Sequence, residues 1–373
     1  MAIVNSNGKN LAIIGASYLQ LPLIIKAKQL GYITHVFAWA ANDVGEKEAD
    51  CFYPISIIEK EKILEKCREI KICGICSIAS DLAVTTVNYV AQKLGLNSNS
   101  MESSPITTNK HLMRNAFEKK ALPSPKSVLV DENTDLSLLN FTFPVIVKPT
   151  DRSGSRGIFK IDNSLDLTVA IEKSIKQSFE KKALVEEFAE GQEYSVEYIS
   201  YHGEHTFLAM TLKYTTGAPF FIETGHLEPA PVSDKILDEV KRIVPSALDS
   251  LLIKEGASHS ELKIDKDGNI KIIEIGARMG GDCIGSDLVQ ISTGYDFLKM
   301  VIDVSVGVKP SFVTCSVPKM VAVKYIFNKN DLSELERIKS EGRLIRIVDY
   351  HPEKIGKITD SSNRAGCYLY YPK

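Results

Sequence analysis

Two glutamates, Glu261 and Glu274, have the spacing of a pair that could hold a metal cation. They lie in segments 258–264 and 270–278, whose alternating apolar residues are typical of strands, and Lys-Asp-Gly-Asn at 266–269 is typical of a tight turn. In a hairpin closed by this turn, the two glutamates face each other with Cβ atoms roughly 5 Å apart. Two carboxylates at this short distance repel each other unless one is protonated or a hard divalent cation lies between them. An ordinary surface hairpin with a shifted register is the alternative.

A second group of residues could bind an anionic phosphate. Arg278 follows the second glutamate by four residues and leads into a glycine-rich stretch, 279–282. Lys148 ends the apolar strand predicted at 143–149, where a buried cation is costly unless an anion meets it. The following loop, 153–157, contains two glycines that let backbone N–H groups approach phosphate oxygens. The P-loop pattern is absent, so this cradle would have another design, and a plain hairpin loop is the alternative.

Further carboxylates suggest a nucleoside site. Glu186 and Glu187 close the strand predicted at 183–188, and Glu193 follows shortly. In a cleft, one of the pair and the backbone after it could read an adenine amino group, and Glu193 could bind ribose hydroxyls; on an exposed edge they would only be solvated. His259 lies two residues before Glu261 and so on the same face of the strand. It could orient a phosphoryl group or a substrate carboxylate, or it could be purely structural.

Three weaker candidates remain. Segment 222–229 has a turn composition, and we expect a solvent loop there, although Glu223 and His226 could contact an amine substrate. Asp81 follows a predicted strand, a place where α/β folds often bind ligands. Arg364 could pair with a substrate carboxylate or hold the C-terminal sheet.

These residues must be positioned by regular elements. In the first hundred residues, strands alternate with amphipathic helices, which predicts a doubly wound α/β domain with a parallel sheet. We expect strands at 11–14, 34–39 and 72–78, and helices at 18–30, 60–71 and 82–94. The turn after the first strand lacks a dinucleotide-binding glycine pattern. Farther along we expect a helix at 108–122, a return strand at 158–161, a helix at 165–179 and a strand from 191 to 199.

Composition limits the classes of partner. Among 373 residues, 45 Lys and Arg face 47 Asp and Glu, which argues against nucleic acid as the main partner. No apolar run approaches the roughly 20 residues of a membrane span, and the N-terminus lacks a secretory signal pattern. The 7 cysteines include one isolated C-x-x-C in a predicted buried strand, which indicates core packing. We expect a cytoplasmic protein.

The order of these segments resembles the ATP-grasp superfamily over nearly the whole chain. That resemblance implies an N-terminal domain (1–105), two lobes of an ATP clamp (106–190 and 191–306) and a C-terminal α/β segment (307–373). The cofactors it implies are ATP and Mg²⁺ or Mn²⁺. The matching segments are 109–110, 144–148, 153–157, 185–189, Glu193, Glu261 and 274–278.

The resemblance also implies a role for each matching residue. Lys110 and Lys148 would contact ATP phosphates, and Arg278 would stabilise the transferred phosphoryl group. Glu261 and Glu274 would hold the metal ions. Around the nucleotide, the lid would be Ser153, Gly154, Ser155, Arg156 and Gly157, the adenine pocket Glu186, Glu187, Phe188 and Ala189, and the ribose ligand Glu193.

One position departs from the family pattern. Gly276 stands where the superfamily usually has a metal-binding Asn, and water, substrate or Asp282 could fill that place. Segments 256–261 and 274–282 are most similar to the amino-acid ligases that make dipeptides, and 361–366 resembles a C-terminal element of those enzymes.

The resemblance therefore predicts an ADP-forming ligase that joins a carboxylate, such as an amino acid, to an amine through an acyl phosphate. The alternatives are a phosphotransferase acting on a small carboxylate and a purine-pathway-like carboxylase or formyl-transferring enzyme. A nucleotide-binding module without turnover is a third possibility, but Lys148, Glu261, Glu274 and Arg278 are all present. The expected partners are small molecules, with no nucleic acid and no membrane; a homodimer is left open.

Overall fold

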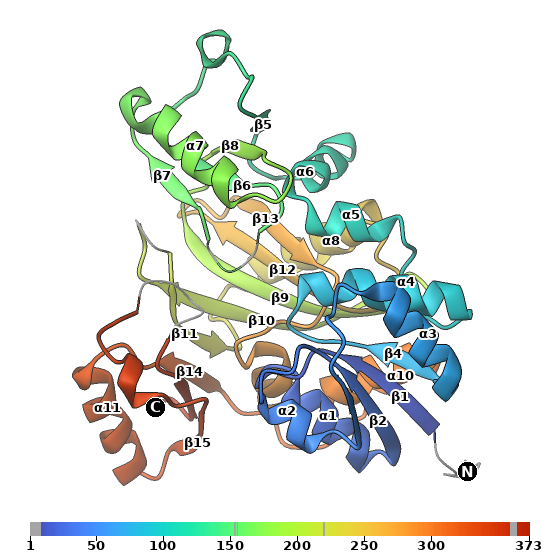
Figure 1. The fold of residues 1–373 in the computed structure, drawn as a ribbon. Coiled ribbons are helices and arrows are strands. Elements are labelled where there is room, and N and C mark those ends of the chain that lie inside the picture. The colour runs from blue at the N-terminus through green and yellow to red at the C-terminus, as the bar shows by residue number, and fades with distance from the viewer. Residues whose placement is uncertain (1–8, 153, 155, 219–220, 359–363) are drawn as a thin grey trace.

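The N-terminal domain is built on a parallel sheet with strand order β3-β2-β1-β4 (Figure 1). The computed structural model describes residues 9–152, 154, 156–218, 221–358 and 364–373. The strands and helices of this domain are β1 (Lys9–Ile14), α1 (Leu21–Gln29), β2 (Tyr32–Phe37), α2 (Val44–Glu48), β3 (Cys51–Tyr53), α3 (Lys60–Ile70), β4 (Gly74–Cys76) and α4 (Asp81–Leu94). The strand–helix alternation predicted from the sequence is therefore confirmed.

Side chains of β1 alternate between two apolar layers because successive residues of a strand point to opposite faces. Leu11 and Ile13 pack in a cluster with α1 and with α10 (Phe297–Ser305), which comes from far along the chain. Ala12 and Ile14 pack in another cluster with α3 and α4. Helices thus cover both faces of the sheet, and one of them is supplied by a distant segment.

Two helices lead from this domain to a small lobe. They are α5 (Ser103–Thr108) and α6 (Lys110–Lys119), and the Asn109 side chain caps α6 by accepting from the N–H groups of His111 and Leu112. The lobe is a sheet of order β5-β8-β6-β7 covered by α7. Its elements are β5 (Ser127–Val130), η1 (Leu136–Leu138), β6 (Val145–Pro149), β7 (Phe159–Ile161), η2 (Ser164–Asp166), α7 (Leu167–Gln177) and β8 (Ala183–Glu187).

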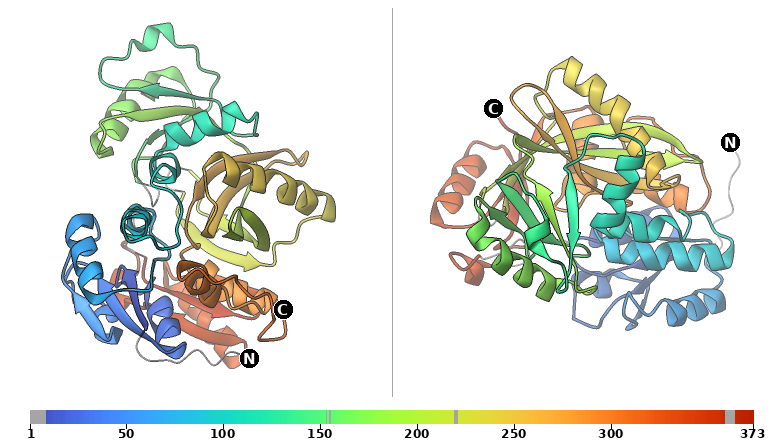
Figure 2. Two further views of the ribbon diagram at one scale, coloured as in Figure 1. Left: turned by 90° about the vertical axis from the view of Figure 1, so that its right-hand side faces the viewer. Right: turned by 90° about the horizontal axis from the view of Figure 1, so that it is seen from above.

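A long antiparallel sheet forms the centre of the molecule, in the order β13-β12-β9-β10-β11-β14-β16-β15. The small lobe stands apart on one side of it, while the N-terminal domain and the C-terminal segment lie toward the other end (Figures 1 and 2). Its strands are β9 (Gln192–Tyr201), β10 (Glu204–Thr215), β11 (Glu223–Glu228), β12 (Gly256–Ile264), β13 (Ile270–Gly276), β14 (Val321–Tyr325), β15 (Leu344–Val348) and β16 (Cys367–Tyr370).

The remaining helices cover the central sheet or its C-terminal extension. They are α8 (Asp234–Ser250), a π-helical turn η3 (Ile284–Leu288), α9 (Val289–Thr293), α10, α11 (Lys329–Ser340) and the short η4 (Pro352–Lys354). The last three strands continue the sheet of the large lobe, so the predicted boundary at 306/307 crosses a continuous sheet, and the domain limits stay a proposal. Within the described part of the chain, none of the helices is long and apolar enough to cross a membrane.

Candidate active site

The central sheet carries a polar face because successive side chains of each strand point into two different environments. On one face, Val196, Tyr198 and Leu262 pack with α8 in an apolar cluster. The opposite face presents charged and polar side chains drawn from neighbouring strands: Glu193, Glu197, Lys213, His226, His259, Glu261 and Lys263. The same alternation that builds the core therefore gathers the ionisable residues.

The predicted glutamate pair lies in register at the edge of this face. Glu261 on β12 is the partner of Glu274 on β13, and His259 is the partner of Gly276. The alternative of a shifted register is thereby excluded, although a bulge follows Glu261. Each carboxylate is paired with a lysine, Glu261 with Lys213 at 2.8 Å and Glu274 with Lys110 at 2.9 Å.

A cleft of about 190 Å³ lies between the small lobe and the polar face. It is lined by residues of both lobes and by one residue of the N-terminal domain, Asp81. The sequence-predicted residues in its lining are Lys110, Lys148, Gly154, Glu186, Glu187, Phe188, Ala189, Glu193, His259, Glu261, Glu274 and Arg278. The small lobe, the large lobe and the N-terminal domain thus all contribute charged residues to one cavity.

Lys148 is held by a buried ion-pair network in the small lobe. Its Nζ lies 2.6 Å from Glu186 Oε2, and Arg114 Nε lies 2.9 Å from the other oxygen of the same carboxylate. Burial lowers the pKa of Lys148, an effect that Glu186 opposes. Glu186 was expected to read adenine, but its carboxylate is engaged by these two cations. Its side chain therefore positions Lys148 in this structure.

Lys110 comes to the cleft from the first turn of α6. Its Nζ also donates to the carbonyl of Arg152 at 2.8 Å, so it ties the start of the phosphate-type loop to Glu274. Arg114 lies four residues later and so on the same face of the helix. The two cations of α6 therefore contact both lobes: Lys110 binds Glu274 and the carbonyl of Arg152, and Arg114 binds Glu186.

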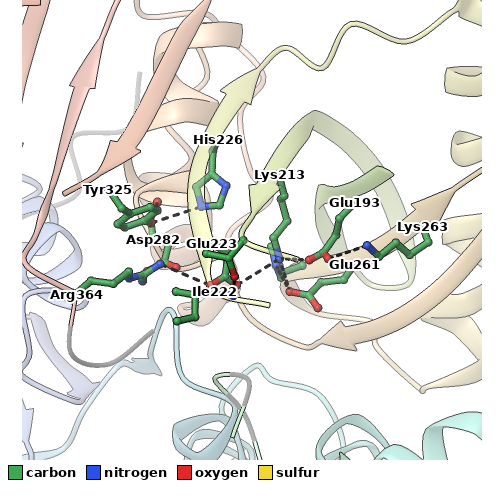
Figure 3. Close-up of polar contacts among 12 residues, drawn as sticks. Glu193, Lys213, Ile222, Glu223, His226, Glu261, Lys263, Asp282, Tyr325 and Arg364 are labelled. Atoms are coloured by element: carbon green, nitrogen blue, oxygen red, sulfur yellow. Dashed lines mark hydrogen bonds and ion pairs between the residues drawn. The ribbon is translucent and has the colours of Figure 1, made fainter. Parts of the chain in front are cut away.

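Lys213 is the centre of the acidic residues on the sheet (Figure 3). Besides Glu261, its Nζ contacts Glu193 at 2.9 Å and lies 3.8 Å from Glu223. Burial alone would lower the pKa of Lys213, but the carboxylates, Glu261 first among them, raise it well above its ordinary value. Lys263 lies 3.3 Å from the other oxygen of Glu193. Glu193 is thus engaged by two lysines in the lining of the cleft.

His259 is buried between two carboxylates. Its Nδ1 is hydrogen-bonded to Glu197, and its Nε2 lies 3.5 Å from Glu261. Glu197 is fully buried and also accepts from the N–H of Gly280 at 2.9 Å. Burial lowers the pKa of His259, but the two carboxylates raise it above the ordinary histidine value overall. His259 is therefore oriented by Glu197 toward the metal-type pair.

A second cavity, of about 610 Å³, adjoins the cleft. The two share Asp81, Gly154, Glu223, His259, Glu261 and Arg278, and the second is lined further by the N-terminal domain and the C-terminal strands. Its wall includes Arg364, which pairs with Asp282 at 2.7 Å and stacks over the ring of Tyr325 at 3.8 Å from the centroid (Figure 3). A small molecule bound in this cavity would therefore contact residues that also line the cleft.

The expectation of a solvent loop at 222–229 is wrong. Residues 223–228 form β11, which pairs with β10 and β14 inside the sheet. His226 is 1% exposed, and burial lowers its pKa to about 3, so its ring is neutral at pH 7. Glycine and proline suggested a loop, but the flanking strands supply the pairing that the sequence composition did not indicate.

Three residues of the predicted lid lie in the described part of the chain. Gly154 lines both cavities and Arg156 lines only the second, whereas a side chain at Gly157 would meet Pro149 and Gln177 at 3.0 and 3.1 Å. Ser153 and Ser155 lie outside the described residues. Asp282, a candidate for the place of the missing Asn, is instead paired with Arg364.

Sequence reasoning missed Arg114, Glu197 and Lys213. Arg114 follows Lys110 by four residues on a helix, and Glu197 follows Glu193 by four on a strand, so periodicity could have pointed to both. Lys213 has no motif, and only strand pairing places it among the glutamates.

Comparison with known proteins agrees with this geometry. The ATP-grasp domain profile matches residues 141–287, the part of the chain that supplies most of the lining of the cleft. The chain also aligns with the fold of an L-amino acid ligase from Bacillus licheniformis, with a TM-score of 0.82 at 23% identity over 97% of this chain and 93% of that one. Residues 141–287 are thus an ATP-grasp domain.

Two curated relatives of this ATP-grasp protein are carboxylate–amine ligases. A D-alanine–D-alanine ligase from Actinobacillus succinogenes is 27% identical over 53% of this chain and 67% of its own length. An alanine–anticapsin ligase from Bacillus subtilis is 23% identical over 60% of this chain and 52% of its own length. The matched part thus spans only about half of the second relative. The predicted superfamily and fold are confirmed.

The donor set of the ATP-grasp cleft fits a hard divalent cation. Glu261 and Glu274 offer carboxylate oxygens in register, the ligands that Mg²⁺ prefers. Among the described residues, no cluster of three or more His, Cys, Asp or Glu could hold a metal ion. Mg²⁺ in nucleotide sites commonly takes one or two carboxylates and completes its shell with phosphates and water, so a pair suffices.

Proposed function

We propose that this protein is an ADP-forming ligase that joins the carboxylate of an amino acid to an amine. The observation that carries the proposal is the in-register pair Glu261/Glu274 in a cleft that also contains Lys110, Lys148 and Arg278. Buried cations beside a carboxylate pair suit the triphosphate of ATP and its metal ions. The relatives named above support the choice of carboxylate and amine as substrates.

The reaction would proceed in two steps. A substrate carboxylate oxygen attacks the γ-phosphorus of ATP, ADP leaves, and an acyl phosphate forms. The nitrogen of the amine then attacks the acyl carbon, inorganic phosphate leaves, and the amine loses a proton. Mg²⁺ held by Glu261 and Glu274 would neutralise the charge on the phosphates. Positioning and charge neutralisation would supply most of the rate enhancement, because no covalent enzyme intermediate is needed.

The residues of the chain would divide this work. Lys110 and Lys148 would hold the phosphates, and Arg278 would stabilise the transferred phosphoryl group. Glu187, Phe188 and Ala189 would surround the adenine, and Glu193 would contact the ribose. The second cavity would take the acid and the amine, because its wall carries both Arg364, which could meet a carboxylate, and the carboxylates of Glu223 and Asp282, which could meet an ammonium group.

Substrate-dependent ADP release tests the proposal. We expect ADP from ATP only when both an amino acid and a second amine are present, together with a coupled product found by mass spectrometry. ADP release with a carboxylate alone would indicate a phosphotransferase instead. A requirement for bicarbonate or formate would indicate the purine-pathway type. A cytoplasmic location and a homodimer remain proposals, the latter testable by sedimentation.

Metal dependence supplies a second test. We expect activity to be lost after exhaustive chelation and restored by Mg²⁺ or Mn²⁺. Glu274→Gln keeps a hydrogen-bond partner for Lys110 but removes the charge, so activity should fall on the order of 10²-fold or more. Binding of Mg²⁺-ADP, followed by calorimetry, should weaken in parallel. The exposed Glu172→Gln on α7 is the control. Full activity in chelator would refute the metal assignment.

A further inference from the structure

The N-terminal domain reaches the catalytic cleft through one carboxylate. Asp81 binds Arg278 in two-point fashion, with Oδ1 2.8 Å from Nε and Oδ2 3.2 Å from Nη2. Both side chains are largely buried, at 18% and 17% exposure. Two parallel hydrogen bonds fix the plane of a guanidinium, which a single contact does not. The orientation of Arg278 is thus set from outside the ATP clamp.

The site of this ion pair is available because residue 276 is glycine. A Cβ built on Gly276 would lie 2.6 Å from Asp81 Oδ1 and 3.1 Å from Arg278 Nε. The first distance is too short for any real side chain. The departure from the usual Asn therefore coincides with a carboxylate from another domain in the same space.

The segment that carries Asp81 is itself held against the segment that carries Arg278. The N–H of Ala79 donates to the carbonyl of Met279 at 3.2 Å, and a Cβ at Gly281 would touch Ala79 at 3.3 Å. Asp81 is the first residue of α4, whose N-cap, Ser80, accepts from the N–H of Ala83. A helix start favours a carboxylate, so Asp81 is stabilised in its charged form. Burial alone would raise the pKa of Asp81, but Arg278 lowers it below the ordinary value.

We propose that Asp81 is a positioning residue of the reaction, which holds the Arg278 guanidinium toward the transferred phosphoryl group in the space that Gly276 leaves open. This inference rests on the proposed ligase function. In this role Asp81 acts through Arg278, so its contribution should appear in turnover and not in nucleotide affinity. Gly276 is then a requirement of the Asp81–Arg278 pair and not a lost metal ligand.

The first experiment separates positioning from folding and binding. In Asp81→Asn, kcat should fall roughly 10- to 100-fold, as is typical when an orienting partner is removed. The KM for ATP, the affinity for Mg²⁺-ADP and the melting temperature should change little. Asp296→Asn is the matched control, because Asp296 also pairs with a cation, Lys26, at 2.7 Å and 18% exposure, and Asn can still cap α10. Its kcat should equal that of the wild type.

A double-mutant cycle tests whether the absence of a side chain at Gly276 makes room for the Asp81 carboxylate. Gly276→Ala should lower kcat because its Cβ displaces the Asp81 carboxylate. In the Asp81→Ala background, the same change should cost much less, since the obstructing oxygen is gone. Additive effects would mean that the glycine and Asp81 act independently, and would overturn the inference.

The outcomes also distinguish this inference from the proposed function. If the wild type releases no ADP with any acid and amine, the ligase function fails and the positioning role fails with it. If the wild type is active and Asp81→Asn matches it in kcat, only the positioning role fails. A loss of activity in Asp81→Asn that is paralleled by lost nucleotide binding and a lower melting temperature would show a merely structural role.

Discussion

At the scale of single residues, the site consists of buried charges that compensate one another. Glu261 is the clearest case: burial alone would raise its pKa, but Lys213 and His259 lower it well below the ordinary value. It is therefore ionised at neutral pH and can act as a metal ligand. Arg278 is similar, because burial opposes its charge while Asp81 raises its pKa above the ordinary value. Such pairs cost desolvation, so their retention suits a role in binding.

Lys148 gives the sharpest prediction at this scale. We expect Lys148→Ala to lower ATP turnover on the order of 10²-fold or more, because a charge-assisted contact to the transferring phosphate is lost. The fold should survive, since Arg114 still pairs with the buried Glu186. Steady-state kinetics and circular dichroism measure the two effects. Lys176→Ala, at an exposed position of α7, is the control. Wild-type turnover at saturating substrate would remove Lys148 from the site.

At the scale of elements, the joint between the lobes is the short connection 188–191 between β8 and β9. Gly191 lies between β8 and β9 with φ of +109°, and a Cβ there would come within 2.2 Å of the carbonyl oxygen of Ile264. The end of β12 therefore packs directly on the backbone of the joint. Only glycine satisfies both the left-handed conformation and the close approach.

Gly191→Ala should lower the free energy of unfolding by about 2–4 kcal/mol, the sum of left-handed strain and overpacking. Gly203→Ala separates the two terms, because Gly203 has φ of +81° but no atom within 4 Å of a built Cβ. That variant should lose only about 1–2 kcal/mol. Urea unfolding of both variants provides the measurement. Equal losses would show that the contact with Ile264 is unimportant.

At the scale of the whole molecule, the long central sheet joins the large lobe to the C-terminal strands, and α10 joins it to the N-terminal domain. A buried acid lies within this sheet. Glu228 on β11 accepts hydrogen bonds from Ser292 and Thr211, and burial raises its pKa to about 7. Its protonation is therefore coupled to the stability of the fold.

The sign of this coupling follows from proton binding. Between pH 4.5 and about 7, Glu228 is protonated in the folded state but ionised in the unfolded chain. The folded state then binds more protons, so its contribution to stability falls as pH rises through this window and is flat on either side. Glu228→Gln should remove that contribution. The free energy of unfolding of the variant, relative to that of the wild type, should therefore be higher at pH 8 than at pH 4. Urea unfolding at several pH values, with the exposed Glu172→Gln as control, checks this difference. The same pH profile in the wild type and Glu228→Gln would contradict it.

The sequence alone determined the local parts of this protein. Strand–helix alternation predicted the N-terminal domain, and the predicted hairpin placed Glu261 opposite Glu274. In the structure the strands pair from Ile264 and Ile270, one residue away from the predicted register, and the bulge after Glu261 restores the pairing of the two glutamates. Lys148 at the end of an apolar strand pointed to the cleft for the same local reason.

Only the tertiary structure decided which distant residues meet. Strand order placed Lys213 among the glutamates and turned the expected loop at 222–229 into β11. It also brought Asp81 to Arg278, 197 positions later in the chain. Pairing between distant strands and packing between domains depend on the whole chain at once. They cannot be predicted from a local hydrophobic period or a sequence motif.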